Sequence, residues 1–302
     1  MENVLTAEQN SMVSFKSIRE KIIIFGRMIK FHHTIFALPF ALSAVVMAWR
    51  DHCPDFSDLF WILVAMVGAR SAAMGFNRIA DAVMDAKNPR TALREIPSGI
   101  LTKKDAFVFV LISSAVFIFS AAMLGKLCFF LSFPVLFFLF FYSYTKRFTK
   151  FCHLYLGFAI SLAPLGAWIA VTDSVSVSVA FLTLALMTYI AGFDILYACQ
   201  DIDFDRREKL YSFPAIKGPE QAMKFSALLH FLTFGFLLIM YFTFKMRPVF
   251  IIFLSLIGIL LVAEHKIVKP NDLQHINMAF FNINSLISIL LFAGILTEAI
   301  VR

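Results

Sequence analysis

The chain has 302 residues, of which 60% are hydrophobic and only 16% are charged, and its formal net charge is +7. A soluble globular domain carries nearer 25% charged residues, so this composition excludes a soluble protein of ordinary make-up. Apolar runs of roughly 20 residues recur along the chain, and that is the length of a helix that crosses a bilayer. The composition therefore predicts an all-α polytopic membrane protein, and the scattered basic residues give no reason to expect a nucleic-acid partner.

The chain opens with about thirty residues that precede the first strongly apolar run, and we expect residues 1–33 to form a cytoplasmic N-terminal segment. Within this segment, apolar side chains recur at helical spacing among Lys and Arg residues; they are Phe15, Ile18, Ile22, Phe25 and Ile29. This pattern is typical of an amphipathic helix that lies at a membrane surface. The transmembrane domain is expected to cover residues 34–302.

Nine apolar runs predict nine transmembrane helices. They cover residues 34–50, 59–77, 104–123, 128–145, 151–172, 179–198, 221–243, 248–264 and 277–300, to within a few residues. Two long polar connections, 78–103 and 199–219, follow the second and the sixth run. The first of them carries Pro89, Pro97 and Gly99, which break helices and indicate a structured loop.

The distribution of Lys and Arg predicts the orientation. If the N-terminus is cytoplasmic, the connections 78–103, 146–150, 199–219 and 265–276 lie on the same side of the membrane. Together with residues 1–30 they hold most of the 27 basic residues, whereas the opposite side holds only Arg50, Lys126, Lys245, Arg247 and Arg302. The positive-inside rule therefore places both long polar connections in the cytoplasm.

Two groups of acidic residues follow apolar runs at this predicted cytoplasmic edge. Asn77, Asp81 and Asp85 are spaced four residues apart and fall on one face of a helix, and Asp201 and Asp205 repeat the spacing. One carboxylate binds Mg²⁺ weakly, but paired acids together with substrate phosphates suit the ion. A single pair of this kind is usually a solvated helix end; two pairs at corresponding edges favour a magnesium site that holds an anionic substrate.

Two further charged residues lie deeper in the predicted membrane. Arg70 precedes Asn77 by seven residues, about 10 Å deeper at 1.5 Å per residue, and Asp194 precedes Asp201 by the same interval. An ionisable group at this depth is expensive and is expected to face the interior and a partner. A site role for each residue and a structural ion pair between the two both remain open.

Several polar residues near the same edge could bind a diphosphate. Arg90 and Arg94 are four residues apart in the first long connection, and Lys146 follows Tyr142 by four residues at the end of the fourth run. A solvated loop explains the two arginines equally well, and membrane topology alone explains the lysine.

In these ordered motifs the chain resembles the UbiA family of intramembrane aromatic prenyltransferases. RSAAMGFNRIADAVMD is similar to the first Asp motif of the family, RTALREIPSG to the segment after it, YSYTKR to a YxxxK signature, and DILYACQDIDFDRREKLYSFPAIKG to the second Asp motif. One departure is Arg78, because many members carry Asp directly after the Asn. The change removes one possible metal ligand and leaves one Asn and four Asp residues.

The resemblance implies a nine-helix bundle around a central cavity and Mg²⁺-dependent transfer of a polyprenyl group from polyprenyl diphosphate to a ring carbon of an aromatic acid, in quinone biosynthesis. It implies these roles: catalysis and metal binding for Asp81, Asp85, Asp201 and Asp205, metal binding also for Asn77, diphosphate binding for Arg90, Arg94, Tyr142 and Lys146, and acceptor binding for Arg70 and Asp194. The expected location is the plasma membrane of a bacterium, with the site facing the cytoplasm.

Two alternatives accompany this interpretation. The acceptor is expected to resemble 4-hydroxybenzoate, but FHHTIFALPFAL and NPRTALREIPSG look more like a branch of the family that uses a naphthoate in the futalosine route to menaquinone. A secondary transporter would also combine intramembrane charges with repeated halves. Transporters more often place such charges at mid-helix, whereas these acids gather at one membrane edge.

Overall fold

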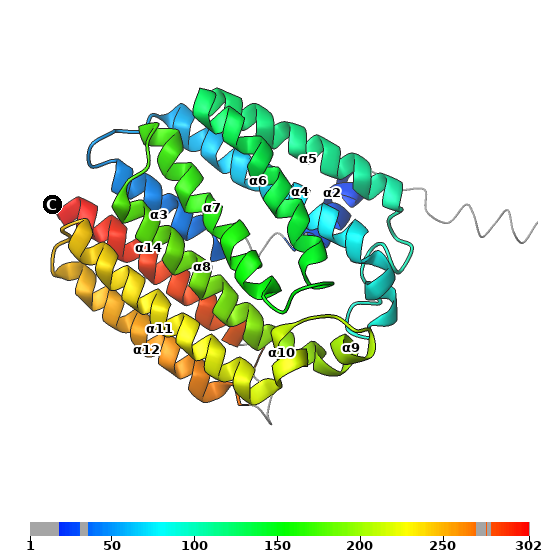
Figure 1. Cartoon of the computed structure of the whole chain (residues 1–302). Helices are drawn as coiled ribbons and strands as arrows, with labels where there is room; N and C mark the ends of the chain where they lie inside the picture. Colours follow the sequence, from blue (N-terminus) through cyan, green and yellow to red (C-terminus); the bar gives the residue numbers. More distant parts are fainter. Residues whose placement is uncertain (1–17, 31–35, 270–275, 277–278, 302) are drawn as a thin grey trace, which may run out of the picture.

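The computed structural model describes residues 18–30, 36–269, 276 and 279–301. Its elements are helices that run side by side as a bundle (Figure 1). Eight of them are long and apolar enough to cross a membrane: α4 (Phe56–Lys87), α5 (Lys103–Leu124), α6 (Lys126–Thr145), α7 (Cys152–Thr172), α8 (Val177–Ala198) with its continuation to Arg207, α11 (Pro219–Thr243), α12 (Val249–Ile267) and the segment Phe281–Val301, which contains α14 (Asn284–Val301).

The predicted all-α membrane fold is confirmed. Among the described residues eight helices are long enough to match predicted spans, and α3 (Leu38–Ala48) is a shorter apolar helix at the place of the first predicted span. This helix has 11 residues, so its described length is shorter than a bilayer span. Residues 31–35, where the first predicted run begins and where the predicted domain boundary between residues 33 and 34 falls, lie outside the described residues. The protein is thus an integral, multi-pass membrane protein by the length and composition of its helices.

The N-terminal helix α2 (Ile18–Met28) lies against α4 and covers part of the predicted amphipathic segment; Phe15 lies outside the described residues. Phe25 stacks on Phe109 of α5 with 4.6 Å between ring centroids, and Met28 is fully buried. Ile22 is 66% exposed. A helix that buries one apolar side against the bundle and exposes another apolar residue suits a position at the membrane surface.

The helices pack as two groups that meet at α7. On one side α4 packs against α5 and α6; on the other, α3, α8, α11, α12 and α14 pack against one another around a core centred on Tyr189, Phe40 and Phe250. Gly157 allows α7 to approach α8 closely, because a Cβ atom there would collide with the carbonyl oxygen of Met187. The space between α4, α5, α6 and α7 is where the cavity lies.

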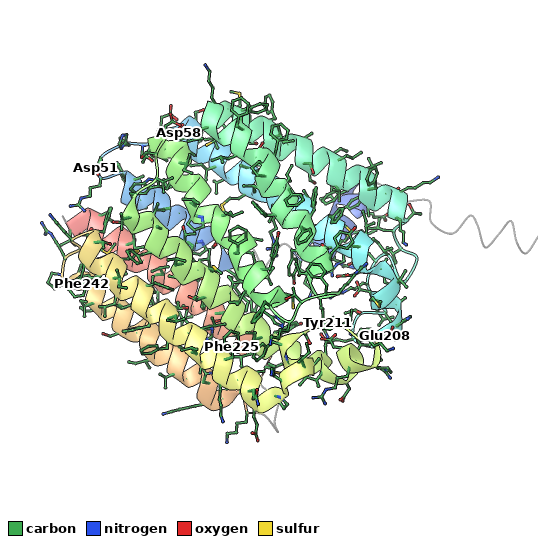
Figure 2. All side chains as sticks on the ribbon, viewed as in Figure 1. Asp51, Asp58, Glu208, Tyr211, Phe225 and Phe242 are labelled. Atoms are coloured by element: carbon green, nitrogen blue, oxygen red, sulfur yellow. The ribbon has the colours of Figure 1, made fainter. Side chains whose placement is uncertain are left out.

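Polar side chains gather at the two ends of the bundle (Figure 2). Asp51 and Asp58 lie at one end, and Glu208 and Tyr211 lie at the other, beside the short helices α9 (Ile202–Arg207) and α10 (Phe213–Lys217). At 1.5 Å per residue the 32 residues of α4 extend about 48 Å, which exceeds the hydrocarbon core of about 30 Å. Its last turns therefore project beyond the core and carry Asn77, Asp81 and Asp85 to the membrane edge.

Candidate active site

Two adjoining cavities occupy the region between α4, α6 and α7. The apolar cavity has a volume of about 220 Å³ and the polar pocket, which lies toward the end that carries α9 and α10, has a volume of about 200 Å³. Asn77 and Tyr142 line both of them. A molecule with an anionic head and an apolar tail would place its head in the polar pocket and its tail in the apolar cavity.

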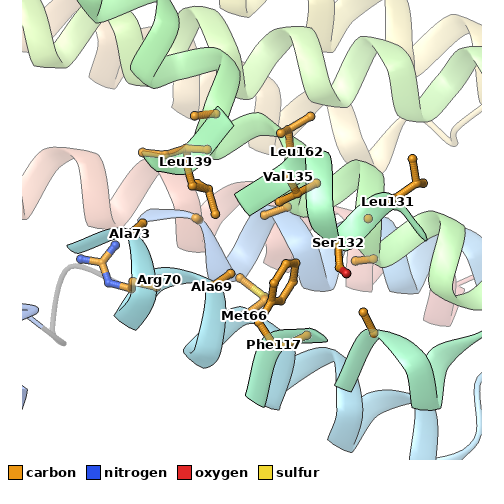
Figure 3. A pocket seen from close by; sticks show the side chains of 18 of the residues that line it. Met66, Ala69, Arg70, Ala73, Phe117, Leu131, Ser132, Val135, Leu139 and Leu162 are labelled. Carbon is orange, nitrogen blue, oxygen red and sulfur yellow. The ribbon is translucent and has the colours of Figure 1, made fainter. Parts of the chain in front are cut away.

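The apolar cavity is lined mainly by α4, α5, α6 and α7 (Figure 3). Small side chains of α4, such as Ala69 and Ala73, leave space open, and larger side chains of α5, α6 and α7 close the walls; among these are Phe117, Leu131, Val135 and Leu162. Alanine has a small side chain and a high helix propensity, so these positions leave space for the cavity without weakening the helix. Among the described residues that line this cavity, Arg70 is the one with a charged side chain.

The polar pocket receives Asp81 and Asp85 from the last turns of α4. Asn77 donates from Nδ2 to Asp81 Oδ2 at 2.9 Å and to Ser143 Oγ at 3.4 Å, so the amide bridges α4 and α6. Asp85 is only 7% exposed. The helical spacing thus brings the three residues to one side of the pocket.

The second acidic pair differs from the prediction in its local backbone. Helix α8 ends at Ala198, Asp201 closes a 3₁₀ turn, and Asp205 lies in α9, so the two residues do not share one continuous α-helical face. The amide of Cys199 bonds to the carbonyl oxygen of Leu196, three residues back, which is the tighter 3₁₀ pattern. Asp201 and Asp205 are nevertheless both buried, at 8% and 0% exposure.

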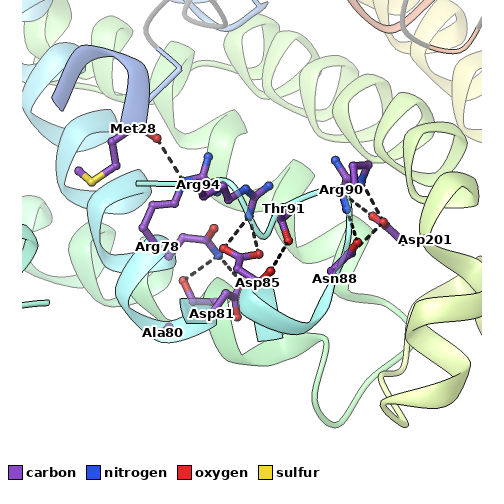
Figure 4. A network of polar contacts seen from close by, with 12 residues as sticks. Met28, Arg78, Ala80, Asp81, Asp85, Asn88, Arg90, Thr91, Arg94 and Asp201 are labelled. Atoms are coloured by element: carbon purple, nitrogen blue, oxygen red, sulfur yellow. Dashed lines mark hydrogen bonds and ion pairs between the residues drawn. The ribbon is translucent and has the colours of Figure 1, made fainter. Parts of the chain in front are cut away.

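Each of the four acids Asp81, Asp85, Asp201 and Asp205 contacts a basic side chain (Figure 4 shows those of Asp85 and Asp201). Arg94 Nη1 donates to both carboxylate oxygens of Asp85 at 2.7 and 2.8 Å. The remaining pairs are Arg90 with Asp201, by Nε at 2.9 Å and Nη2 at 2.5 Å, Lys146 Nζ with Asp205 Oδ1 at 2.7 Å, and Arg147 Nη2 with Asp81 Oδ1 at 3.4 Å. The structure thus brings Arg90, Arg94 and Lys146 together with the predicted acids.

The connection after α4 is folded tightly against both acidic groups. Thr91 Oγ1 donates to the carbonyl oxygen of Asp85 at 3.1 Å, and Asn88 Nδ2 donates to Asp201 Oδ1 at 3.1 Å. Gly99 closes the turn before α5 with φ of 78°, a backbone conformation that favours glycine. The loop therefore holds Arg90 and Arg94 at fixed positions in the lining of the polar pocket.

The oxygen atoms available as metal ligands at this edge fit Mg²⁺. Carboxylate and amide oxygens are hard ligands, and Mg²⁺ characteristically uses one or two carboxylates and completes its octahedron with water and phosphate oxygens. Among the described residues no group of three His, Cys, Asp or Glu side chains could hold a metal ion by itself. The arrangement fits ions that are shared between paired acids and a bound diphosphate, and it does not resemble a cage made by protein alone.

Arg70 and Asp194, the two deep charges, do not pair with each other. Arg70 donates from Nη2 to the carbonyl oxygen of Lys30 at 3.2 Å, and its Nε, which is buried, has no hydrogen-bond partner among the described residues. Asp194 instead contacts His153 of α7, with 2.6 Å between Oδ2 and Nδ1. The possibility of an Arg70–Asp194 ion pair is therefore wrong, because a buried histidine from the neighbouring helix lies closer to the carboxylate.

Sequence reasoning missed several residues of the site. Arg147 follows Lys146 in a basic turn, where topology explained both residues equally well. His153 has no metal-ligand spacing, and Asn88 directly precedes Pro89 in a loop. Lys30 lies at the end of the amphipathic segment; burial and the nearby charges of three arginines lower the pKa of its ammonium group to about 8. Lys30 lines neither cavity, and no motif or spacing in the sequence singles it out.

In this helical membrane protein a pocket lined by acidic and basic residues adjoins an apolar cavity. This arrangement is typical of an intramembrane enzyme that acts on an amphiphilic anion. Residues 37–286 match the model of the UbiA prenyltransferase family. The chain belongs to the UbiA prenyltransferase family and is a prenyltransferase, which decides against the transporter alternative.

Similar proteins agree with this assignment. A "4-hydroxybenzoate octaprenyltransferase" of Vibrio atlanticus (strain LGP32) is 29% identical over 231 residues, which cover 76% of this chain and 81% of that protein. One of Pasteurella multocida (strain Pm70) is 27% identical over 270 residues, covering 88% and 92%. An apo structure of a UbiA homolog from Aeropyrum pernix K1 superposes with a TM-score of 0.78 at 29% identity, covering 88% of this chain and 98% of that one. A UbiA homolog from Archaeoglobus fulgidus, solved with GPP and Mg²⁺, shares the fold with a TM-score of 0.66 at 19% identity, covering 90% and 99%.

Proposed function

We propose that the protein transfers a polyprenyl group from polyprenyl diphosphate to a ring carbon of an aromatic acid, with Mg²⁺, in quinone biosynthesis. The observation that carries the proposal is the junction of the two cavities at Asn77 and Tyr142. A prenyl chain belongs in the apolar cavity and its diphosphate among the acids and bases. The bond that breaks, between the prenyl carbon and the diphosphate oxygen, would then lie beside Asn77 and Tyr142.

The acids and bases would exchange partners when substrate binds. Mg²⁺, when bound, would neutralise the diphosphate and help it to leave; its ligands would be Asp81, Asp85, Asp201 and Asp205, with Asn77 beside them. Arg90, Arg94 and Lys146, released from those carboxylates, would turn to the phosphate oxygens, where a bidentate guanidinium is especially suited. Preorganised positive charge of this kind stabilises the charge that grows on a departing diphosphate.

Bond cleavage leaves its electron pair on the diphosphate and an allylic cation on the prenyl chain. A ring carbon of the acceptor attacks the cation, a carbon–carbon bond forms, and the ring proton leaves to diphosphate or water. Excluding water from the apolar cavity protects the cation from hydrolysis. The aromatic lining, which includes Phe117 and Tyr142, offers π faces that favour a cation.

An aromatic carboxylic acid is the acceptor that Arg70 favours. A guanidinium in an apolar cavity, with a buried Nε that lacks a partner among the described residues, suits the carboxylate of a bound ligand. Asp194, across the junction in the polar pocket, would accept a hydrogen bond from the acceptor hydroxyl. The curated relatives act, by their names, on 4-hydroxybenzoate. A hydroxylated naphthoate carries the same carboxylate and hydroxyl groups and remains the alternative acceptor.

Purified protein, Mg²⁺ and a polyprenyl diphosphate, offered 4-hydroxybenzoate and hydroxylated naphthoates in turn, tests the proposal. We expect one acceptor to give a product whose mass equals acceptor plus prenyl group less one hydrogen. Chelation of Mg²⁺ and the Asp201→Asn variant serve as controls, and both should abolish the product. Release of diphosphate without any prenylated acceptor would reject the acceptor class, and the absence of diphosphate release would reject prenyl transfer.

The polar pocket is proposed to face the cytoplasm of a bacterium. The support is the charge distribution, since the end that bears Arg90, Arg94, Lys146 and Arg147 is also the end predicted to be inside. The diphosphate group of the prenyl donor, which lies in water at the membrane surface, and a water-soluble aromatic acid would both reach the pocket from that side.

A further inference from the structure

His153, in the first turn of α7, links two parts of the site that are far apart in sequence. Its Nδ1 lies 2.6 Å from Asp194 Oδ2 on α8, and its Nε2 lies 3.4 Å from the backbone nitrogen of Phe213, the first residue of α10. We propose that His153 is a positioning residue that fixes the Asp194 carboxylate for the aromatic acceptor. This role rests on the proposed function, in which Asp194 contacts the acceptor.

The two partners determine which nitrogen carries the proton. A backbone amide can only donate, so Nε2 must present its lone pair to Phe213. The hydrogen of the neutral imidazole then sits on Nδ1 and points at the carboxylate. The geometry thus assigns a neutral His153 in the Nδ1–H form, donating one strong hydrogen bond to Asp194.

The two nitrogens of the histidine are already occupied, although both His153 and Asp194 line the polar pocket. His153 is 4% exposed, and its Nδ1 and Nε2 bond to Asp194 and Phe213, whereas the side chain of Asp194 is 21% exposed. Because Oδ2 is held by the imidazole, Oδ1 is the oxygen left for a ligand. His153 therefore acts through Asp194 and does not itself touch the acceptor.

The partner of Asp194 sets it apart from the other acids of the pocket. Asp81, Asp85, Asp201 and Asp205 each contact Lys or Arg, while Asp194 has no Lys or Arg ion pair among the described residues. A neutral imidazole orients a carboxylate without cancelling its charge. Asp194 therefore keeps its capacity to accept a hydrogen bond from a phenol hydroxyl. This hydrogen bond raises the electron density of the ring that must attack the prenyl cation.

The second bond of His153 ties this orientation to the segment after the second acidic pair. Tyr211 N donates to the carbonyl oxygen of Lys146 at 2.7 Å, and Leu210 N donates to that of Asp205 at 2.8 Å, directly before Phe213 reaches the imidazole. The ring of Phe213 stacks on Phe225 of α11, with 4.7 Å between centroids. The same short segment therefore contacts the diphosphate side of the pocket and the histidine that positions the acceptor side.

Two variants of nearly equal size separate positioning from packing. In His153→Asn the side-chain amide nitrogen stands near the place of Nδ1 and can still donate to Asp194, whereas His153→Leu has no donor. We expect His153→Leu to raise the acceptor KM or lower kcat at least tenfold, with prenyl diphosphate KM and Tm nearly unchanged, and His153→Asn to recover most of the loss. Equal defects in both variants, or parallel losses in both KM values and in Tm, would overturn the proposal.

A readout that needs no turnover distinguishes this inference from the proposed function. With ¹⁵N-labelled histidine, the signals that vanish in His153→Asn belong to His153, one of seven histidines. We expect a protonated Nδ1 and an unprotonated Nε2 near neutral pH, and a changed Nδ1 signal in Asp194→Asn. A ring protonated at both nitrogens, or an Nδ1 signal indifferent to Asp194→Asn, would reject the positioning role even if prenyl transfer is observed. Failure of wild-type protein to prenylate any acceptor would instead reject the function on which it rests.

Discussion

Replacement of Arg70 by Gln tests how the acceptor is bound. The guanidinium lines the apolar cavity, its Nη2 donates to the Lys30 carbonyl oxygen at 3.2 Å, and its buried Nε has no partner among the described residues. If the acceptor carboxylate binds there, the glutamine variant keeps one neutral donor and loses the charge-assisted pair. The loss should then appear in the acceptor KM and leave the prenyl diphosphate KM alone.

The size of the effect follows from the bonds involved. A hydrogen bond to a charged group contributes about 1.5–3 kcal/mol, and a neutral one about 1 kcal/mol. Loss of about 2–3 kcal/mol corresponds to a rise of roughly 30- to 140-fold in the acceptor KM, since 1.4 kcal/mol is tenfold. The free energy of unfolding should fall by about 1 kcal/mol or less, because a single bond to Lys30 is affected and a desolvated charge is removed at the same time.

Arg78 supplies a matched control on the same helix. Its Nε donates to the carbonyl oxygen of Met28 at 3.2 Å, so it also anchors the end of α2, yet it lines neither cavity. Arg78→Gln should lower Tm and leave the acceptor KM within about twofold. Steady-state kinetics with each substrate varied in turn, and thermal unfolding in detergent, measure both variants. An unchanged acceptor KM in Arg70→Gln, together with a large loss of stability, would refute the acceptor role.

Four further predictions concern the polar pocket and the orientation. Asn substituted singly for each of the acids Asp81, Asp85, Asp201 and Asp205 should cut turnover at limiting Mg²⁺ at least 100-fold in folded protein, and near-normal turnover in two of the four would count against their role. Mg²⁺ and pyrophosphate together should raise Tm by more than the sum of their separate effects, because each alone must break acid–base pairs that both together replace; additive shifts would contradict the exchange of partners. Lys30 lines neither cavity, but its charge acts on Arg90 and Arg94 beside the polar pocket. Its pKa is lowered to about 8, so the positive charge near the pocket is lost as pH rises from 7 to 9; pyrophosphate should bind more weakly over that range, and Lys30→Met should show a flatter pH profile, whereas an identical slope in both proteins would exclude Lys30 as the cause. Single cysteines at Lys103 and Lys217, in a background that lacks Cys53, Cys128, Cys152 and Cys199, should resist an impermeant thiol reagent in intact cells, and labelling from outside would reverse the proposed orientation.

The first acidic cluster was predictable because its geometry is local. Residues four apart lie on one face of any α-helix, so Asn77, Asp81 and Asp85 had to share a side once α4 was recognised as a helix. The second cluster obeyed the same spacing, but its backbone tightened into a 3₁₀ turn at Asp201. Neighbouring atoms decide such a change, and here Asn88 and Arg90 from another segment hold the Asp201 carboxylate.

The partners of the charged residues could not be read from spacing. Arg70 and Asp194 lie at similar intervals before their clusters, and equal depth made an ion pair plausible. Whether two charges meet depends on the rotation of two helices about their axes and on what stands between them. In the folded chain His153 from α7 occupies the place beside Asp194, and Arg70 turns to the end of α2.

The sequence by itself determined that this protein is a bundle of apolar helices in a membrane, which motifs it carries and which residues stand at one membrane edge, since runs of hydrophobic residues and helical periodicity are properties of consecutive residues. Only the tertiary structure decided that Arg90 from the first connection and Lys146 from the basic turn reach the second acidic pair, and that Asn77 and Tyr142 join an apolar cavity to a polar pocket. The physical reason is that these contacts join residues far apart in the chain, and their distances depend on how whole helices pack and not on the spacing within any one of them.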